Sequence, residues 1–186
     1  MPDRRIPLVL GCLLLCAAAP ALAGAREDVI AASRKMLALK TYHVTLTGPG
    51  MSSEADFVAP DRYRLTMPAG TQTIVGDTMY LSMQGRSMRV PLRKGVLTQW
   101  RDPMLLRGNE AKLSATALGS ETVDGKPARK YAVRNADHPE LRITLWIGAG
   151  GMPLRIDSEG GAGAAGRTTL RYSRFDDPTL RIDAPK

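Results

Sequence analysis

Hydrophobic residues recur with two different periods along this chain, and the change of period separates helical from extended segments. Val29, Ile30, Met36 and Leu37 are spaced as on one face of a helix within residues 26–39. The acidic residues at the start of this segment suit the positive end of a helix dipole. The spacing therefore predicts an amphipathic helix over residues 26–39.

From residue 42 onward, apolar and polar residues alternate, and short turns rich in glycine and proline interrupt the alternation. Tyr42, Val44 and Leu46 begin this pattern, which has the period of a β-strand with one buried face. Six short strands are expected here, at residues 42–47, 57–58, 63–67, 71–75, 78–83 and 88–90. Their close spacing is typical of an antiparallel meander.

Residues 102–119 have a different pattern. Asp102 and Pro103 suit the first residues of a helix, and apolar residues follow them up to Gly119. Gly108 and Asn109 interrupt this segment, so we expect one broken helix or two short ones. The alternation then resumes, and strand segments are expected at residues 120–123, 128–133, 141–147, 152–158, 168–175 and 180–182.

The expected strands, about 11 in all, have one apolar face and one polar face. Antiparallel sheets with one solvated face have this pattern. So many strands cannot lie in one flat sheet, and their apolar face has to be covered. The sequence therefore predicts a mostly β, α+β fold: a curled antiparallel sheet whose concave side is covered by the N-terminal helix and the helical insert.

The first 23 residues have the features of an export signal. Arg4 and Arg5 precede an apolar run at residues 6–19, and residues 21–23 (ALA) form a small-residue cleavage pattern. The apolar run is short for a membrane span, which needs about 20 residues. We therefore expect a signal peptide at residues 1–23 and a single periplasmic domain at residues 24–186.

Cysteine usage supports this division of the chain. Both cysteines, Cys12 and Cys16, lie within the expected signal, so residues 24–186 contain no thiol for a disulfide, a nucleophile or a metal site. The sequence before Cys12 faintly resembles a lipoprotein-processing box, but most of the apolar run follows this cysteine. A membrane-anchored lipoprotein is the alternative location.

Charge and reactive groups argue against nucleic-acid binding and against catalysis. The formal net charge is +8, but the arginines are scattered singly along alternating segments, as on the outer faces of strands. The two histidines, His43 and His138, are far apart in the sequence and have no metal-type partner at close spacing. We expect no enzyme activity, no metal and no cofactor.

The apolar composition instead indicates a binding function. Eight of the nine methionines follow residue 23, where only two phenylalanines and two tryptophans accompany them. Methionine side chains adapt to irregular apolar shapes, although they also substitute for leucine in ordinary cores. A curled sheet with few large aromatic residues can enclose one apolar ligand. The candidate lining residues are Leu65, Met67, Met79, Leu81, Met83, Met88, Met104, Leu105, Leu113, Ile143 and Leu145.

Several short motifs resemble those of one known family. They lie at residues 55–65 (ADFVAPDRYRL), 74–80 (IVGDTMY), 123–131 (VDGKPARKY), 145–147 (LWI), 152–156 (MPLRI) and 172–175 (YSRF). In this order they resemble the periplasmic lipoprotein-carrier (LolA-like) superfamily. The resemblance implies a half-open antiparallel barrel with a helical lid over an apolar cavity for acyl chains. The glycine- and alanine-rich stretch at residues 160–166 departs from true lipoprotein carriers.

Two functions are compatible with these patterns. The first is a periplasmic carrier that holds a lipid, an acyl chain or a lipoprotein anchor, with membrane or envelope proteins as further partners. The second is an envelope sensor or accessory interaction module whose barrel is filled by its own side chains. The two differ in whether the concave side is hollow.

Overall fold

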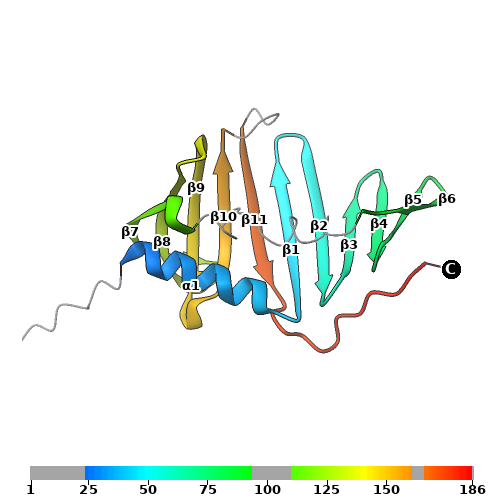
Figure 1. Cartoon of the computed structure of the whole chain (residues 1–186), viewed down its shortest axis with the longest axis horizontal. Coiled ribbons are helices and arrows are strands. Elements are labelled where there is room, and N and C mark those ends of the chain that lie inside the picture. The colour runs from blue at the N-terminus through cyan, green and yellow to red at the C-terminus, as the bar shows by residue number, and fades with distance from the viewer. Residues whose placement is uncertain (1–23, 94–109, 161–165, 186) are drawn as a thin grey trace, which may run out of the picture.

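One antiparallel sheet of 11 strands organises the residues that the computed structural model describes, 24–93, 110–160 and 166–185. The strand order across the sheet is β6-β5-β4-β3-β2-β1-β11-β10-β9-β8-β7 (Figure 1). The strands are β1 (Thr41–Gly48), β2 (Met51–Val58), β3 (Arg62–Met67), β4 (Gly70–Val75), β5 (Thr78–Met83), β6 (Arg86–Pro91), β7 (Leu113–Val123), β8 (Lys126–Asn135), β9 (His138–Gly148), β10 (Pro153–Glu159) and β11 (Arg167–Ser173). The expected curved, unclosed antiparallel sheet is confirmed.

The sheet consists of two meanders that meet at the pairing of β1 with β11. In the first meander, β1 to β6 follow one another across the sheet, as the alternation of residues 42–90 predicts. Four of its five turns contain only two residues, because the pairs Gly48–Met51, Met67–Gly70, Val75–Thr78 and Met83–Arg86 close them. The second meander runs from β7 to β11 and returns to β1, where Val44 faces Tyr172.

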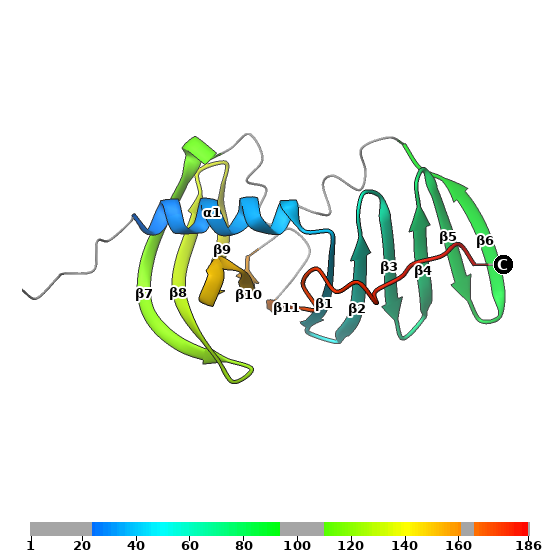
Figure 2. The ribbon, with the colours of Figure 1, turned by 90° about the horizontal axis from the view of Figure 1, so that it is seen from below.

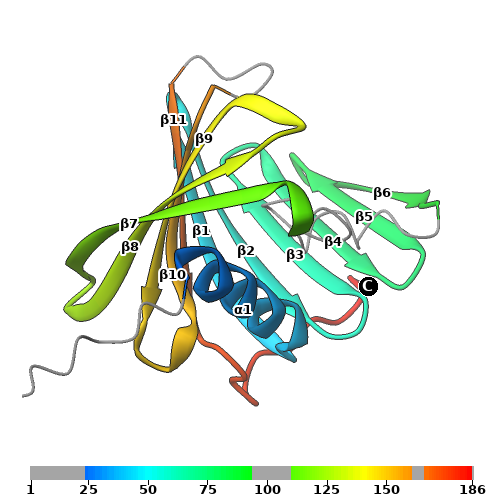
Figure 3. The ribbon, with the colours of Figure 1, turned by 60° about the vertical axis from the view of Figure 1, so that its left-hand side comes forward.

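The helix α1 (Ala25–Ala38) crosses the concave side of the sheet over β7 to β10 (Figures 2 and 3). Val29, Ala32 and Met36 are buried and belong to the same core as Leu145 and Ile147 of β9. The expected N-terminal helix is therefore confirmed. Within the described part of the chain, no helix is long and apolar enough to span a membrane.

The prediction of a helical insert at residues 102–119 is wrong for its second half, residues 110–119. Residues 110–112 form one 3₁₀ turn, η1, and residues 113–119 belong to strand β7 rather than to a helix. Leu113 and Ala115 also alternate with polar residues, so this stretch fits both periods, and pairing with β8 selects the strand. The first half, residues 102–109, lies outside the described residues.

The strand expected at residues 180–182 is also absent. Leu180 and Ile182 are buried, but this segment has no regular structure and contacts the sheet without pairing with a strand. Both edges of β11 are already paired, with β1 and β10, so the chain after β11 finds no edge beside it. Arg62 instead donates a hydrogen bond to the carbonyl oxygen of Ile182 at 2.6 Å.

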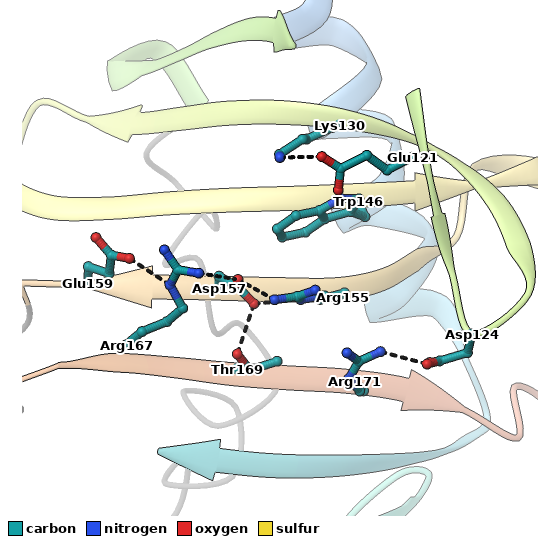
Figure 4. Close-up of polar contacts among 10 residues, drawn as sticks. All are labelled: Glu121, Asp124, Lys130, Trp146, Arg155, Asp157, Glu159, Arg167, Thr169 and Arg171. Atoms are coloured by element: carbon teal, nitrogen blue, oxygen red, sulfur yellow. Dashed lines mark hydrogen bonds and ion pairs between the residues drawn. The ribbon is translucent and has the colours of Figure 1, made fainter. Parts of the chain in front are cut away.

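The outer face of β7 to β11 carries a network of charged side chains around two buried groups (Figure 4). Asp157 is buried and accepts hydrogen bonds from the Arg155 guanidinium at 2.7 and 2.6 Å and from the Thr169 hydroxyl at 3.0 Å. Trp146 donates to Glu121 at 2.9 Å, and the Arg155 guanidinium carbon lies 4.5 Å from the Trp146 ring centroid. Each buried polar group of this network thus has a partner.

The alternation of residues 141–147 places Trp146 on the polar face of the sheet, and it lies there, but it is buried. The β7–β8 hairpin supplies Val123 and Ala128, which pack with Trp146 and Leu154 in a second small core. At the turn of this hairpin, Asp124 forms an ion pair with Arg171 of β11 at 2.6 Å. The hairpin end is therefore fastened across the outer face of the sheet.

Polar contacts also fix α1 to the second meander. Arg26 donates to the carbonyl oxygens of Leu113 at 3.0 Å and Glu110 at 2.7 Å. Asp28 accepts hydrogen bonds from Arg129 at 2.9 Å and from the Tyr131 hydroxyl at 2.7 Å. Burial, and next the hydrogen bond to Asp28, raise the pKa of Tyr131 to about 12. These contacts lock the helix to β7 and β8.

Removing the buried carboxylate of Asp157 should destabilise the fold strongly. We expect Asp157→Ala to lower the free energy of unfolding by about 3–5 kcal/mol, because Arg155 is left without its charge partner in a half-buried site. Glu159→Ala is the control, since its ion pair with Arg167 is exposed and such pairs contribute about 0–1 kcal/mol. Urea unfolding measures both variants, and equal losses would contradict this ranking.

The hydrogen bond of Tyr131 to Asp28 should stabilise the protein in a pH-dependent way. We expect Tyr131→Phe to cost about 1.5–3 kcal/mol, the range for hydrogen bonds to charged groups. The raised pKa means that the folded state retains the phenol proton more strongly, so this stabilisation is complete below pH 10. It should disappear as the pH rises from 10 towards 12.

Unfolding titrations of wild type and Tyr131→Phe across that pH range measure the difference. Tyr80→Phe is the matched control, because Tyr80 is half-buried and stacks with Arg89 through its ring, which phenylalanine retains. A stability difference between wild type and Tyr131→Phe that persists unchanged at pH 12 would show that the hydrogen bond is not its cause.

Candidate functional site

A pocket of about 130 Å³ lies on the concave side of the sheet, beside the part that α1 covers. Five strands contribute to it: β1, β2, β3, β4 and β11. Its lining residues are Tyr42, Val44, Ala55, Tyr63, Leu65, Gln72, Ile74, Leu170 and Tyr172. The pocket therefore bridges the junction of the two meanders.

The strand register explains why a hollow forms at this place. Tyr172, Val44, Ala55, Leu65 and Gln72 face one another in turn across β11, β1, β2, β3 and β4. Valine and alanine in the middle of this row are small, so the side chains of the row leave space above them.

The neighbouring row is aromatic and fills its own space. The Tyr42 and Phe57 ring centroids are 5.0 Å apart, and those of Phe57 and Tyr63 are 4.8 Å apart. These distances are typical of packed aromatic pairs. The aromatic row therefore forms a firm wall on one side of the pocket.

The pocket is electrically neutral among its described lining residues. The Tyr42 and Tyr63 hydroxyl oxygens are 3.2 Å apart and form a hydrogen bond. Burial raises the pKa of Tyr172 far above its usual range, so this phenol stays protonated at any physiological pH. An ionised ligand group would find no countercharge here and would lose its hydration.

Of the predicted lining residues, Leu65 lines this pocket directly. Met67, Met79, Leu81, Met83 and Met88 occupy the same concave phase on β3, β5 and β6 but do not line the pocket. Met79 and Leu81 are half-buried, whereas Met83 and Met88 are exposed. They extend the apolar surface away from α1.

The other predicted lining residues lie elsewhere. Leu113, Ile143 and Leu145 are buried in the core beneath α1 and do not line the pocket. Met104 and Leu105 fall outside the described residues. The predicted lining residues thus fall into two groups. Those of the first meander share the open concave face with the pocket, whereas Leu113, Ile143 and Leu145 are packed in the core beneath α1.

Sequence reasoning missed most of the pocket lining. The alternation places Tyr42, Val44 and Tyr63 on the same face as Leu65, so this signal was present in the first meander. Leu170 and Tyr172 could not be assigned, because the pairing of β11 with β1 joins segments about 125 residues apart in sequence, as the Val44–Tyr172 pair shows.

Groups that could support catalysis or metal binding lie apart from this pocket. His43 Nδ1 is 2.8 Å from Asp56 Oδ1 on the outer face, and His138 Nδ1 is 3.5 Å from Glu140. The described part of the chain has no group of three or more His, Cys, Asp or Glu side chains that could hold a metal ion. Each histidine thus has a carboxylate partner outside the pocket.

No family model matches the sequence, and none of the curated proteins matches it. The fold is similar to that of the lipoprotein LppX from Mycobacterium tuberculosis, with a TM-score of 0.64 and 16% identity over 85% of this chain and 97% of that chain. The match to LprF from Mycobacterium bovis has a TM-score of 0.63 and 16% identity, and it covers 87% of this chain and 96% of that chain. The match to MucB has a TM-score of 0.52 and 15% identity, and it covers 87% of this chain but only 62% of that chain.

The TM-scores of LppX and LprF establish a shared fold, and at 16% identity they establish no more than that. LppX and LprF match the present chain over nearly their whole length, so the similarity includes both meanders and their junction. The chain therefore has the half-open barrel fold that the LolA-like sequence motifs predict.

Proposed function

We propose that this protein binds a lipid or another ligand with an acyl chain, in the bacterial envelope, without chemical conversion of the ligand. The observation that supports this proposal is the uncharged pocket at the junction of β1 and β11, lined by apolar and tyrosine side chains. The shared fold with the lipoprotein LppX and with LprF, and the export signal expected at residues 1–23, fit a location in the envelope.

The size of the pocket restricts how such a ligand is held. Pockets for drug-sized ligands usually measure about 300–1,000 Å³, whereas a cavity of about 150 Å³ holds a molecule the size of benzene. The present pocket, about 130 Å³, thus accommodates a short part of an acyl chain. We infer that the rest of the chain extends over the concave face of β5 and β6, along Met79, Leu81 and Met88.

Apolar burial would drive this binding. Each buried methylene contributes about 0.8 kcal/mol, so a few carbons in the pocket contribute only about 2–3 kcal/mol, and the part of the chain that extends over β5 and β6 has to supply the rest of the affinity. The neutral lining favours hydrocarbon over charged groups, and the polar headgroup is expected to remain in solvent. Binding by burial needs no covalent step and can be reversed.

The alternative function, an interaction module with a filled barrel, also has support. The half of the concave side beneath α1 is packed with buried side chains, among them Met36, Leu145 and Ile147. A protein that used this fold only as a scaffold would show such packing throughout. The presence or absence of bound lipid therefore decides between the two proposals.

Lipid extraction tests this point. The protein, expressed from its full sequence and purified from the envelope, should release lipid into organic solvent, detected by mass spectrometry. Ala55→Phe places a ring in the pocket, and we expect it to reduce the lipid recovered per protein at least about tenfold, equal to about 1.4 kcal/mol of affinity. Ala55→Leu is a smaller substitution that should give a weaker reduction.

Ala136→Phe is the matched control, because Ala136 is exposed and lies at the β8–β9 turn, away from the pocket. This control should retain the lipid content of the wild type. If the wild type releases no lipid, or if Ala55→Phe and Ala136→Phe retain equal amounts, the interaction-module proposal is favoured instead. Circular dichroism confirms that each variant is folded.

A further inference from the structure

Three methionines stand at one end of the first meander, each beside a two-residue turn. Met51 follows the β1–β2 turn, Met67 precedes the β3–β4 turn, and Met83 precedes the β5–β6 turn. We call these three residues the methionine rim. Because β1 to β6 are consecutive antiparallel strands, the three turns lie at the same end of the sheet, the upper end in Figure 1.

All three side chains belong to the concave phase of the sheet. Met51 pairs with Gly48, which follows Tyr42, Val44 and Leu46 in the same alternation, and Met67 follows Leu65. The Met83 position follows Leu81 in the same way. The rim therefore continues the apolar surface of the pocket to the end of the strands.

Two of the three rim side chains are exposed although they are apolar, and Met67 is half-buried. Met51 is 48% exposed and Met83 is 49% exposed, and Met88, on β6 opposite Leu81, is 61% exposed. Among large hydrophobic side chains of the described residues, one other has comparable exposure, Leu118 of β7 at 51%. Two of the four most exposed large apolar side chains of the described residues, Met51 and Met83, thus stand at one end of the first meander, where clustering indicates an interaction surface.

The charge distribution distinguishes this end from the opposite one. Residues 47–53, 66–71 and 82–87 surround the three turns and contain no acidic residue and one basic residue, Arg86. The turns at the opposite end contain Asp61 and Asp77. An end that carries methionines and a single arginine is compatible with the apolar boundary of a lipid bilayer and its anionic headgroups. The opposite end is mixed in charge, because Lys40 and Arg62 lie there with Asp61 and Asp77.

The turns also have the rigidity that docking favours. Each contains two residues between paired strand ends, and Gly50, Gln84 and Gly85 adopt the positive φ angles that such tight turns require. Short turns lose little conformational freedom when they contact a surface, so the cost of ordering is small.

We propose that the methionine rim docks on the surface of a lipid bilayer and places the end of the first meander among the headgroups. A lipid chain leaving the bilayer would then meet the apolar side chains of Met67 and Leu65 on its way to the pocket. The docking itself does not require an occupied pocket; its role in ligand transfer rests on the proposed function.

Vesicle flotation tests the docking. The protein, expressed from its full sequence, is mixed with vesicles of phosphatidylethanolamine and phosphatidylglycerol. We expect the wild type to float with the vesicles, and the double variant Met51→Asn, Met83→Asn to bind more than about tenfold more weakly, since two apolar side chains no longer enter the bilayer boundary. Asparagine adds no charge, so repulsion by phosphatidylglycerol does not contribute.

Leu118→Asn is the matched control, because Leu118 has the same exposure but lies on β7, away from the rim. It should float as the wild type does. The proposal is overturned if the wild type does not float, if the double variant floats equally well, or if Leu118→Asn weakens flotation as much. It is also overturned if the double variant dissociates a dimer in size-exclusion chromatography without any loss of flotation, which would assign the rim to a second copy.

Two further measurements separate this proposal from that of the pocket. Ala55→Phe should lose its extractable lipid but still float, because the pocket lies away from the docking surface. The double variant at Met51 and Met83 should retain extractable lipid when purified. A failure of flotation alone therefore refutes the docking, and a failure of lipid extraction alone refutes the binding function.

Discussion

The pairing of β1 with β11 is the contact on which the rest of the structure depends. It joins the two meanders into one sheet through five residue pairs, from His43–Ser173 to Thr47–Thr169. Without it, the first meander would expose an edge at β1 and the second an edge at β11. The same pairing places Tyr172 beside Val44 and so completes the pocket. One long-range pairing thus determines both the continuity of the sheet and its candidate site.

A single helix cannot cover the concave side of this sheet, and the distribution of filled and hollow regions follows from that mismatch. The 14 residues of α1 span roughly 21 Å at 1.5 Å per residue, whereas strands lie about 4.8 Å apart. A helix that crosses the strands therefore covers about four of them, here β7 to β10. Beneath it the side chains form a solid core, and beside it small residues such as Ala55 leave a hollow.

The local pattern of the sequence predicts the helix and the strands of this fold better than it predicts which of them lie side by side in space. The alternation from Tyr42 to Val90 predicts the first meander and the face of each side chain. Residues 113–118 fit both a helix and a strand, and only pairing with β8 decides between them. The burial of Trp146 depends on a hairpin that folds over it, and the pocket depends on β11 lying next to β1. Contacts of this kind are formed between distant segments, so no local period encodes them.

The two faces of the sheet use different interactions, and this difference supports binding on the concave side. On the outer face, groups such as Asp157 and Glu121 have charged or hydrogen-bonding partners within the protein. On the concave side of the first meander, Leu65 and Met79 offer apolar surface that α1 does not cover. Because buried hydrocarbon needs no geometrically matched partner, such a surface can accept flexible chains of differing length. The first meander therefore combines a rigid hydrogen-bonded frame with an adaptable apolar face, the combination that reversible burial of an acyl chain requires.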